Sequence, residues 1–194
     1  MSANAAPALN APRRVSDKRG WPRTGAVVAV ALLAAFLVWL LLIRDGGGSA
    51  PAAGAGPVAV SEDDLAALAD EVGHPVYWAG PQDGAELEAT RTENGQVYVR
   101  YLTDGAPIGD ESGEFLTVGT YPFPGVQATL EGLADRGGAL VNETPDGNLV
   151  VTNRDQANSV YIADPDEELQ VEVYDPDPER AFTLATSGGI VAVE

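Results

Sequence analysis

The sequence has no cysteine, and its 194 residues include one histidine, His74, and one lysine, Lys18. Disulfides, cysteine zinc sites and a lipid-bearing cysteine anchor are therefore excluded, and a zinc site with two imidazoles lacks its second ligand. A phosphate-binding loop, a pyridoxal Schiff base and a Ser-Lys dyad each need a lysine, and Lys18 lies in the basic N-terminal stretch. These shortages exclude most catalytic chemistry from the rest of the chain.

Positive charge is also scarce, and it is distributed very unevenly. Residues 1–24 carry five basic side chains against one acidic residue, Asp17, whereas residues 58–194 carry five arginines against 27 aspartates and glutamates. The first segment is therefore near +4 and the second near −22. A domain of that negative charge has the wrong sign to neutralise phosphates, so nucleic acid is not expected as a partner.

One long apolar run separates these two regions. Gly25–Ile43 contains no charged side chain and, as a helix, would span about 28 Å at 1.5 Å per residue, close to the roughly 30 Å hydrocarbon core of a bilayer. The excess of basic residues before this segment predicts an N-terminus in the cytoplasm and the remaining chain outside. The sequence thus predicts a single transmembrane helix that contacts the lipid bilayer and anchors an extracytoplasmic domain.

A cleaved signal peptide is the alternative interpretation of the same segment. Its apolar part exceeds the usual 7–15 residues of a signal core, which favours an uncleaved anchor, although the small residues at 49–53 resemble a cleavage site. Glycine, alanine and proline dominate residues 44–57, which predicts a flexible linker. The expected organisation is a cytoplasmic tail (1–24), a transmembrane helix (25–43), the linker (44–57) and an acidic domain (58–194).

Periodic apolar positions and turn residues predict the elements of the acidic domain. Helices are expected at 62–72, capped by Ser61 and ended by Gly73, from Val126 to the glycines at 137–138, and after Asp177 with Gly188 beyond its end. Strands are expected at 75–79, 86–92, 96–102, 115–121, 139–144, 148–153, 159–163 and 169–174. In the last strand, Leu169, Val171 and Val173 should point inward, with Gln170 and Glu172 outward.

This order, αββββαββββα, predicts an α+β domain with an antiparallel sheet and about three short helices, rather than a doubly wound parallel sheet. The tight Asn94-Gly95 pair favours a type I′ hairpin between two of the strands. Each half contains one helix followed by four strands, an arrangement compatible with an internal αββββ duplication.

Four phrases carry a family resemblance: HPVYWAGP, GQVYVRYL, LTVGTYP and LQVEVYDPDPERA. They resemble uncharacterised single-pass membrane-anchored proteins of high-GC actinobacteria, over roughly residues 61–193. The alanine-, glycine-, aspartate- and arginine-rich, lysine-poor composition is similar to that of such genomes. The resemblance implies a location at the membrane, and it implies no activity, cofactor or site residue.

Candidate site residues are few. No serine lies in a nucleophile motif that His74 could serve, so His74 is interpreted as a loop imidazole before Pro75, and no catalytic residue is expected. The densest acidic stretch offers Asp164, Asp166, Glu167 and Glu168 as calcium candidates, but its spacing matches no EF-hand, which favours a solvated loop without a metal or cofactor.

Two further patterns leave alternatives open. Six aromatic residues are interpreted mainly as core, with a carbohydrate-stacking face as the alternative: Tyr77, Trp78, Tyr98, Tyr101, Tyr121 and Phe123. The abundant carboxylates also permit a carboxylate-based hydrolase. The expected role is a non-catalytic module for interaction, sensing or envelope structure, working with an envelope or membrane protein partner. A calcium- or carbohydrate-binding module is the alternative.

Overall fold

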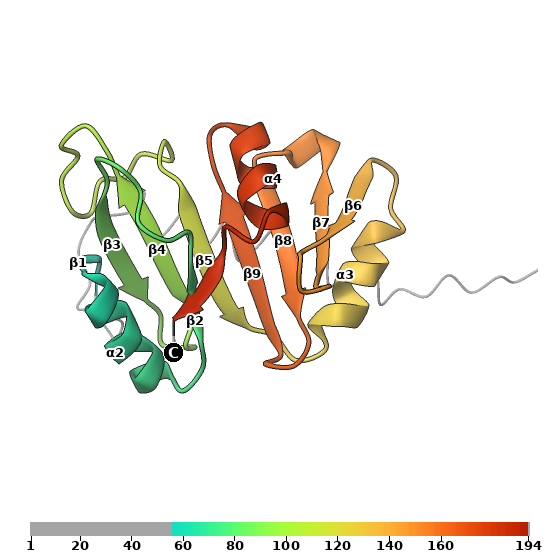
Figure 1. Ribbon diagram of the computed structural model, residues 1–194, viewed down its shortest axis with the longest axis horizontal. Helices are drawn as coiled ribbons and strands as arrows, with labels where there is room; N and C mark the ends of the chain where they lie inside the picture. Colours follow the sequence, from blue (N-terminus) through green and yellow to red (C-terminus); the bar gives the residue numbers. More distant parts are fainter. Residues whose placement is uncertain (1–55, 194) are drawn as a thin grey trace, which may run out of the picture.

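The computed structural model describes residues 56–193, which form an antiparallel sheet with helices on both faces. Figure 1 shows the eight strands of the main sheet in the order β1-β3-β4-β5-β9-β8-β7-β6. Along the chain they are β1 (Val58–Ala59), β3 (Glu86–Arg91), β4 (Val97–Leu102), β5 (Thr117–Pro122), β6 (Ala139–Glu143), β7 (Leu149–Asn153), β8 (Ser159–Asp164) and β9 (Leu169–Tyr174). A second, two-stranded sheet pairs β2 (Val76–Trp78) with β10 (Val191–Val193).

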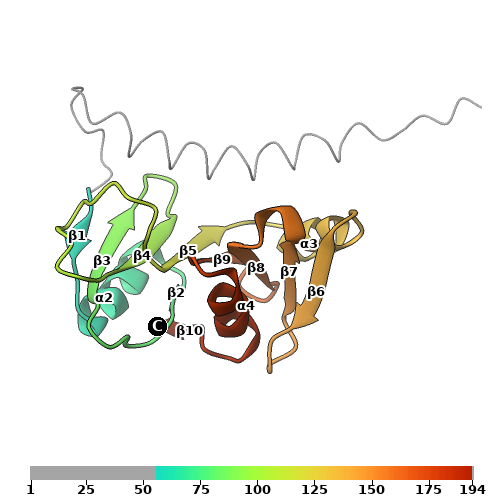
Figure 2. The same cartoon turned by 90° about the horizontal axis from the view of Figure 1, so that it is seen from above.

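Three α-helices and one short 3₁₀ helix occur among the described residues. They are α2 (Glu62–Val72), α3 (Val126–Ala134), η1 (Arg154–Gln156) and α4 (Pro178–Thr186). Helix α4 and the β2–β10 pair cover one face of the main sheet, and α3 covers the other (Figure 2). We call these the α4 face and the α3 face. The predicted α+β class, with an antiparallel sheet and three helices, is confirmed.

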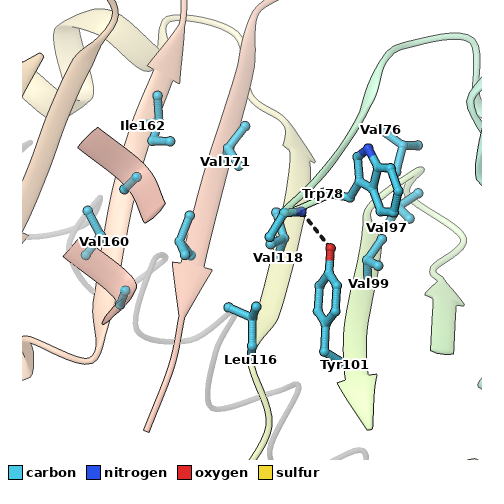
Figure 3. Packing of buried hydrophobic residues seen from close by; sticks show 14 of the residues in the cluster. Val76, Trp78, Val97, Val99, Tyr101, Leu116, Val118, Val160, Ile162 and Val171 are labelled. Carbon is cyan, nitrogen blue, oxygen red and sulfur yellow. Dashed lines mark hydrogen bonds between the residues drawn. The ribbon is translucent and has the colours of Figure 1, made fainter. Parts of the chain in front are cut away.

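The larger apolar core lies on the α4 face. Valine side chains from β4, β5, β8 and β9 point to the same side and pack beneath α2, α4 and the β2–β10 pair (Figure 3). Trp78 and Tyr101 are also buried in this core, and the Tyr101 hydroxyl accepts a hydrogen bond of 2.6 Å from the backbone N–H of Ala79. A smaller core on the α3 face joins Val126 and Leu130 of α3 to Val151 and Ala163 of the sheet.

The helix boundaries agree with the predicted signals. The Ser61 side chain accepts from the N–H of Asp64 and the Asp64 carboxylate accepts from the N–H of Ser61, while Gly73 ends α2 at φ 77°. Asp177 caps α4 through the N–H groups of Glu179 and Arg180, directly before Pro178. Local capping chemistry therefore fixes where these helices begin and end.

The turn between β3 and β4 differs from the prediction, although the hairpin itself is confirmed. A type I′ turn needs positive φ at both Asn94 and Gly95, but only Gly95 has it, at 75°. The N–H of Thr92 donates to Gln96 and the N–H of Gly95 donates to Thr92, so the connection is one residue longer than a two-residue turn. In the longer loop only the final glycine needs a positive φ, so Asn94 avoids that unfavourable conformation.

The first and last described strands, β1 and β10, were not predicted. Each half does place one helix before four strands, but the two sets occupy different positions. Strand β2 follows α2 and leaves the main sheet to pair with β10, whereas β6 follows α3 and forms an edge of that sheet. The two helices also pack in different cores, α2 on the α4 face and α3 on the opposite one.

Residues 56–193 contain no helix long and apolar enough to cross a bilayer. The predicted transmembrane helix at Gly25–Ile43, the basic tail and most of the linker lie outside the described residues.

Candidate functional site

A cavity of about 270 Å³ lies on the α4 face, where the main sheet, the end of α4 and the β2–β10 pair meet. Its less polar lining consists of Ile162, Val171, Ala185, Gly188, Ile190, Val191 and Ala192. Its polar lining consists of Tyr77, Thr144, Asp146, Asn148 and Asp164. Ligand pockets are typically apolar with a few converging polar groups and measure roughly 300–1,000 Å³. This cavity has that mixed lining and lies just below that range of volumes, so it suits only a very small molecule.

Local sequence signals explain how distant segments reach the cavity. Gly188 adopts φ 79° directly after α4 and redirects the chain into β10, where Ala192 pairs with Tyr77 of β2. A Cβ on Gly188 would lie 3.2 Å from the ring of Pro145, so the close approach of the β6–β7 loop also favours glycine there. In that loop the N–H of Asn148 donates to Thr144 Oγ1 at 3.0 Å.

Tyr77 and Asp164 form the central polar contact of the cavity. The Tyr77 hydroxyl donates a short hydrogen bond to Asp164 Oδ2. Asp164 Oδ1 accepts from the N–H groups of Asp166, at 3.2 Å, and Glu167, at 3.3 Å, so the carboxylate is fixed by the β8–β9 turn. Burial, and next the hydrogen bond and charge of Asp164, raise the pKa of Tyr77, which keeps its hydroxyl protonated.

Asp146 differs from Asp164 because it is exposed at the β6–β7 turn. Asp146 forms no ion pair with another described residue. Its charge, with those of Asp164 and Glu167, contributes to the raised pKa of Tyr77. Both charged residues that line the cavity are carboxylates, and neither has a cationic partner among the described residues.

The calcium candidates do not gather into a metal site. Asp164 is largely buried and accepts hydrogen bonds from Tyr77 and from the β8–β9 turn, whereas Asp166, Glu167 and Glu168 are exposed. Among residues 56–193, no three histidine, aspartate or glutamate side chains are arranged to hold a metal ion. The Asp164 carboxylate acts here as a hydrogen-bond acceptor that orders the turn.

A second polar cluster lies on the α3 face around Glu172. The Glu172 residue is 6% exposed, and its Oε2 accepts from the Tyr121 hydroxyl at 2.7 Å. Neither Glu172 Oε1 nor the neighbouring Gln170 Oε1 receives a hydrogen bond of normal geometry from the described residues. Burial raises the pKa of Glu172, and the hydroxyls of Tyr121, Ser159 and Tyr161 oppose this rise only in part.

Gly119 creates the space for this cluster. It lies directly opposite Glu172 in the β5–β9 register, and a Cβ on Gly119 would lie 2.7 Å from the Tyr121 hydroxyl. Tyr121 therefore lies across the glycine and reaches Glu172. Tyr98 meets Tyr121 edge to face, with ring centroids 5.6 Å apart, and burial raises the pKa of Tyr98 to about 12.

The prediction that Gln170 and Glu172 point to solvent is wrong, since both are buried. Alternation in β9 indicated one solvent-exposed face, but β9 lies in the middle of the sheet and the side chains on both of its faces are buried. The sequence signal for this cluster is a set of three tyrosines and one glycine that strand pairing places around one glutamate. Those registers cannot be read before the strand order is known.

His74 lies between helix α2 and β2 and is partly buried. Its Nδ1 lies 2.8 Å from the carbonyl oxygen of Pro75, and its Nε2 lies 2.8 Å from that of Gly95. A neutral imidazole donates through one nitrogen, so only the protonated ring can donate to both oxygens. The ring links the start of β2 to the β3–β4 turn, and no described serine is hydrogen-bonded to it.

The aromatic residues do not form one stacking face. Trp78 and Tyr101 are buried on the α4 face, Tyr98 and Tyr121 on the α3 face, and Tyr77 lines the cavity. Phe123 packs against the small core beneath α3. This placement agrees with the interpretation of the set as mainly core.

Comparison with known proteins finds no match to this chain among family models, curated proteins or solved structures.

Proposed function

We propose that this protein is a non-catalytic sensing domain held outside the cell membrane by one helix at Gly25–Ile43, with the cavity as its ligand site. The observation that carries the proposal is the cavity itself, in which a fixed polar group, the Tyr77–Asp164 pair, faces walls formed by the aliphatic side chains of Ile162 and Val171. Such a combination orients a small molecule and gives it apolar contact. The resemblance to membrane-anchored proteins and the charge asymmetry support the location.

The cavity also provides a way for ligand binding to be detected by a partner protein. One wall is β10, a strand of three residues with exposed side chains at Val191 and Ala192, and it is held to the domain by its pairing with β2. A ligand in the cavity would add contacts between β10, α4 and the sheet and so stabilise the pairing of β10 with β2. A membrane or envelope protein that contacts β10 would then distinguish the occupied domain from the empty one.

The location is tested by labelling single cysteines in this cysteine-free chain. In intact cells, a membrane-impermeant maleimide should label Asp135→Cys, an exposed position at the C-terminal end of α3, and should leave Ser2→Cys unlabelled until the cells are lysed. Both variants should label after lysis, which controls for reactivity. Labelling of Ser2→Cys and protection of Asp135→Cys in intact cells would contradict the proposed orientation.

The ligand site is tested with 1-pentanol, a small neutral probe, and the full chain in phosphatidylcholine nanodiscs. Ligand-observed NMR should show saturable binding that is lost in Ala185→Leu, which fills the cavity from α4, and in Ala192→Phe, which narrows it from exposed β10. Gly132→Ala, at an open position on α3, should bind normally. Equal binding by all variants would show that the probe does not use the cavity.

A further inference from the structure

The charges around the cavity specify a ligand class, an inference that rests on the proposed function. Asp146 and Asp164 are the charged residues of its lining, and both are carboxylates. The oxygens of Asp164 already accept hydrogen bonds from Tyr77 and from the β8–β9 turn. Asp146, exposed in the β6–β7 turn beside the cavity, takes part in none of the ion pairs among the described residues.

The uncharged polar groups add acceptors to the same wall. Because the Tyr77 hydroxyl donates its hydrogen to Asp164, its oxygen can only accept from a ligand. Thr144 and Asn148 also line the cavity, and the side chain of each contains an acceptor oxygen as well as a donor. An ammonium group has three donors and no acceptor, so it suits a wall that combines negative charge with an excess of acceptors.

The remaining walls of the cavity are apolar and suit the hydrocarbon part of a ligand. Ala185 of α4, Ile190 and Val191 also line the cavity, together with Ile162 and Val171 of the sheet. A fully polar cation such as a hydrated metal ion would leave these walls without contact, whereas a short hydrocarbon chain would remove them from water. The net charge near −22 of residues 58–194 would also raise the local concentration of cations.

We propose that the cavity binds a small organic ammonium ion, with its ammonium group beside Asp146 and Tyr77 and its hydrocarbon part against α4 and β10. The volume of about 270 Å³ limits the ligand to a few carbon atoms beyond the ammonium group. The cation is recognised through the charge of the exposed Asp146 and through hydrogen bonding to the Tyr77 hydroxyl.

The test compares three probes of matched size, pentylammonium, 1-pentanol and pentanoate, on the full chain in phosphatidylcholine nanodiscs, with signal from empty nanodiscs subtracted. We expect pentylammonium to bind about fivefold more tightly than 1-pentanol, the size of effect of one partly exposed charge pair, and pentanoate to bind most weakly. The preference for the cation should decrease between about 0.02 M and 0.5 M sodium chloride because salt screens the exposed Asp146.

Variants separate this inference from the proposed ligand site. Asp146→Asn should bring the affinity for pentylammonium close to that for 1-pentanol, whereas Asp135→Asn, an equal charge change on the α3 face, should leave the ratio unchanged. Ala185→Leu and Ala192→Phe should abolish binding of all three probes. Equal or tighter binding of 1-pentanol or pentanoate in the unaltered chain would overturn the ammonium proposal and leave the ligand site standing. Failure of every probe to bind would overturn both.

Discussion

Two buried glutamates on the α3 face, one in each half of the sheet, receive different partners. Glu88 of β3 is fully buried and forms an ion pair of 2.8 Å with Arg100 of β4. Glu172 of β9 is 6% exposed and is surrounded by tyrosine and serine hydroxyls, with no cation among its partners. Burial alone therefore does not decide how a carboxylate is accommodated, because the neighbouring strand must supply either a counter-charge or hydrogen-bond donors.

The Glu88–Arg100 pair also organises the long loop between β4 and β5. Arg100 Nη2 donates to the carbonyl oxygen of Ser112 at 2.9 Å, and the N–H of Gly109 donates to the second oxygen of Glu88. The guanidinium lies over the Phe115 ring, 5.3 Å from its centroid. The ion pair thus holds residues in both halves of this loop. The Glu172 cluster, in contrast, connects strands of the sheet only to one another.

The largest expected effect comes from breaking the ion pair. Arg100→Met should destabilise the fold by about 3–5 kcal/mol, because it leaves Glu88 buried without a counter-charge. Thermal unfolding of the full chain in nanodiscs measures the loss, and hydrogen exchange should show an exposed loop near Gly109. The control is Arg91→Met, which removes an ion pair with Glu71 whose side chains are 41% and 66% exposed and should cost less than about 1 kcal/mol. Equal losses in the two variants would contradict the role given to the buried pair.

A smaller effect is expected from disturbing the Glu172 cluster sterically. Gly119→Ala should destabilise the fold by about 1–3 kcal/mol, since the new Cβ would lie 2.7 Å from the Tyr121 hydroxyl and 2.8 Å from Cε2 of its ring. The matched change Gly132→Ala meets no atom within 4 Å inside α3 and should instead stabilise by about 0.5–1 kcal/mol through helix propensity. Opposite shifts in melting temperature are the expected result, and a neutral Gly119→Ala would show that Tyr121 has room to move.

Local elements were predictable because their signals lie within a few residues. Ser61, Asp64 and Gly73 fix both ends of α2, and Asp177 with Pro178 fixes the start of α4. The turn at Asn94-Gly95 was recognised, but its length depends on the φ that Asn94 adopts, and no neighbouring residue specifies that angle.

The cavity could not be predicted, because its lining comes from segments separated by more than a hundred residues, from Tyr77 to Ala192. They meet only when β10, a strand of three residues with no strong sequence signal, returns to pair with β2. The outward orientation predicted for Glu172 was wrong for a related reason. Alternation in β9 identifies two faces, but it does not tell whether the second face is covered, which depends on the position of β9 in the sheet.

The subtlest prediction concerns the charge of Glu172. Burial raises its pKa above the ordinary value of 4.5, so the folded chain keeps this proton to a higher pH than the unfolded chain. Below pH 4.5 the carboxyl is neutral in both states and its burial carries no charge penalty. As the pH rises through the folded-state pKa, the folded chain must ionise a buried group or hold a proton that the unfolded chain has released, and stability falls.

Replacement by a neutral amide isolates this effect. Glu172→Gln keeps an acceptor for the Tyr121 hydroxyl and removes the titration, so it should leave stability nearly unchanged at pH 4 and increase it by about 1 kcal/mol at pH 8. Glu93→Gln, an exposed change in the β3–β4 turn, accounts for the general benefit of removing one charge from an acidic domain. Melting temperatures of the three chains between pH 4 and pH 8 measure the difference. A gain from Glu172→Gln that does not exceed that of Glu93→Gln at pH 8 would mean that the surrounding hydroxyls fully offset the cost of burying the Glu172 carboxylate.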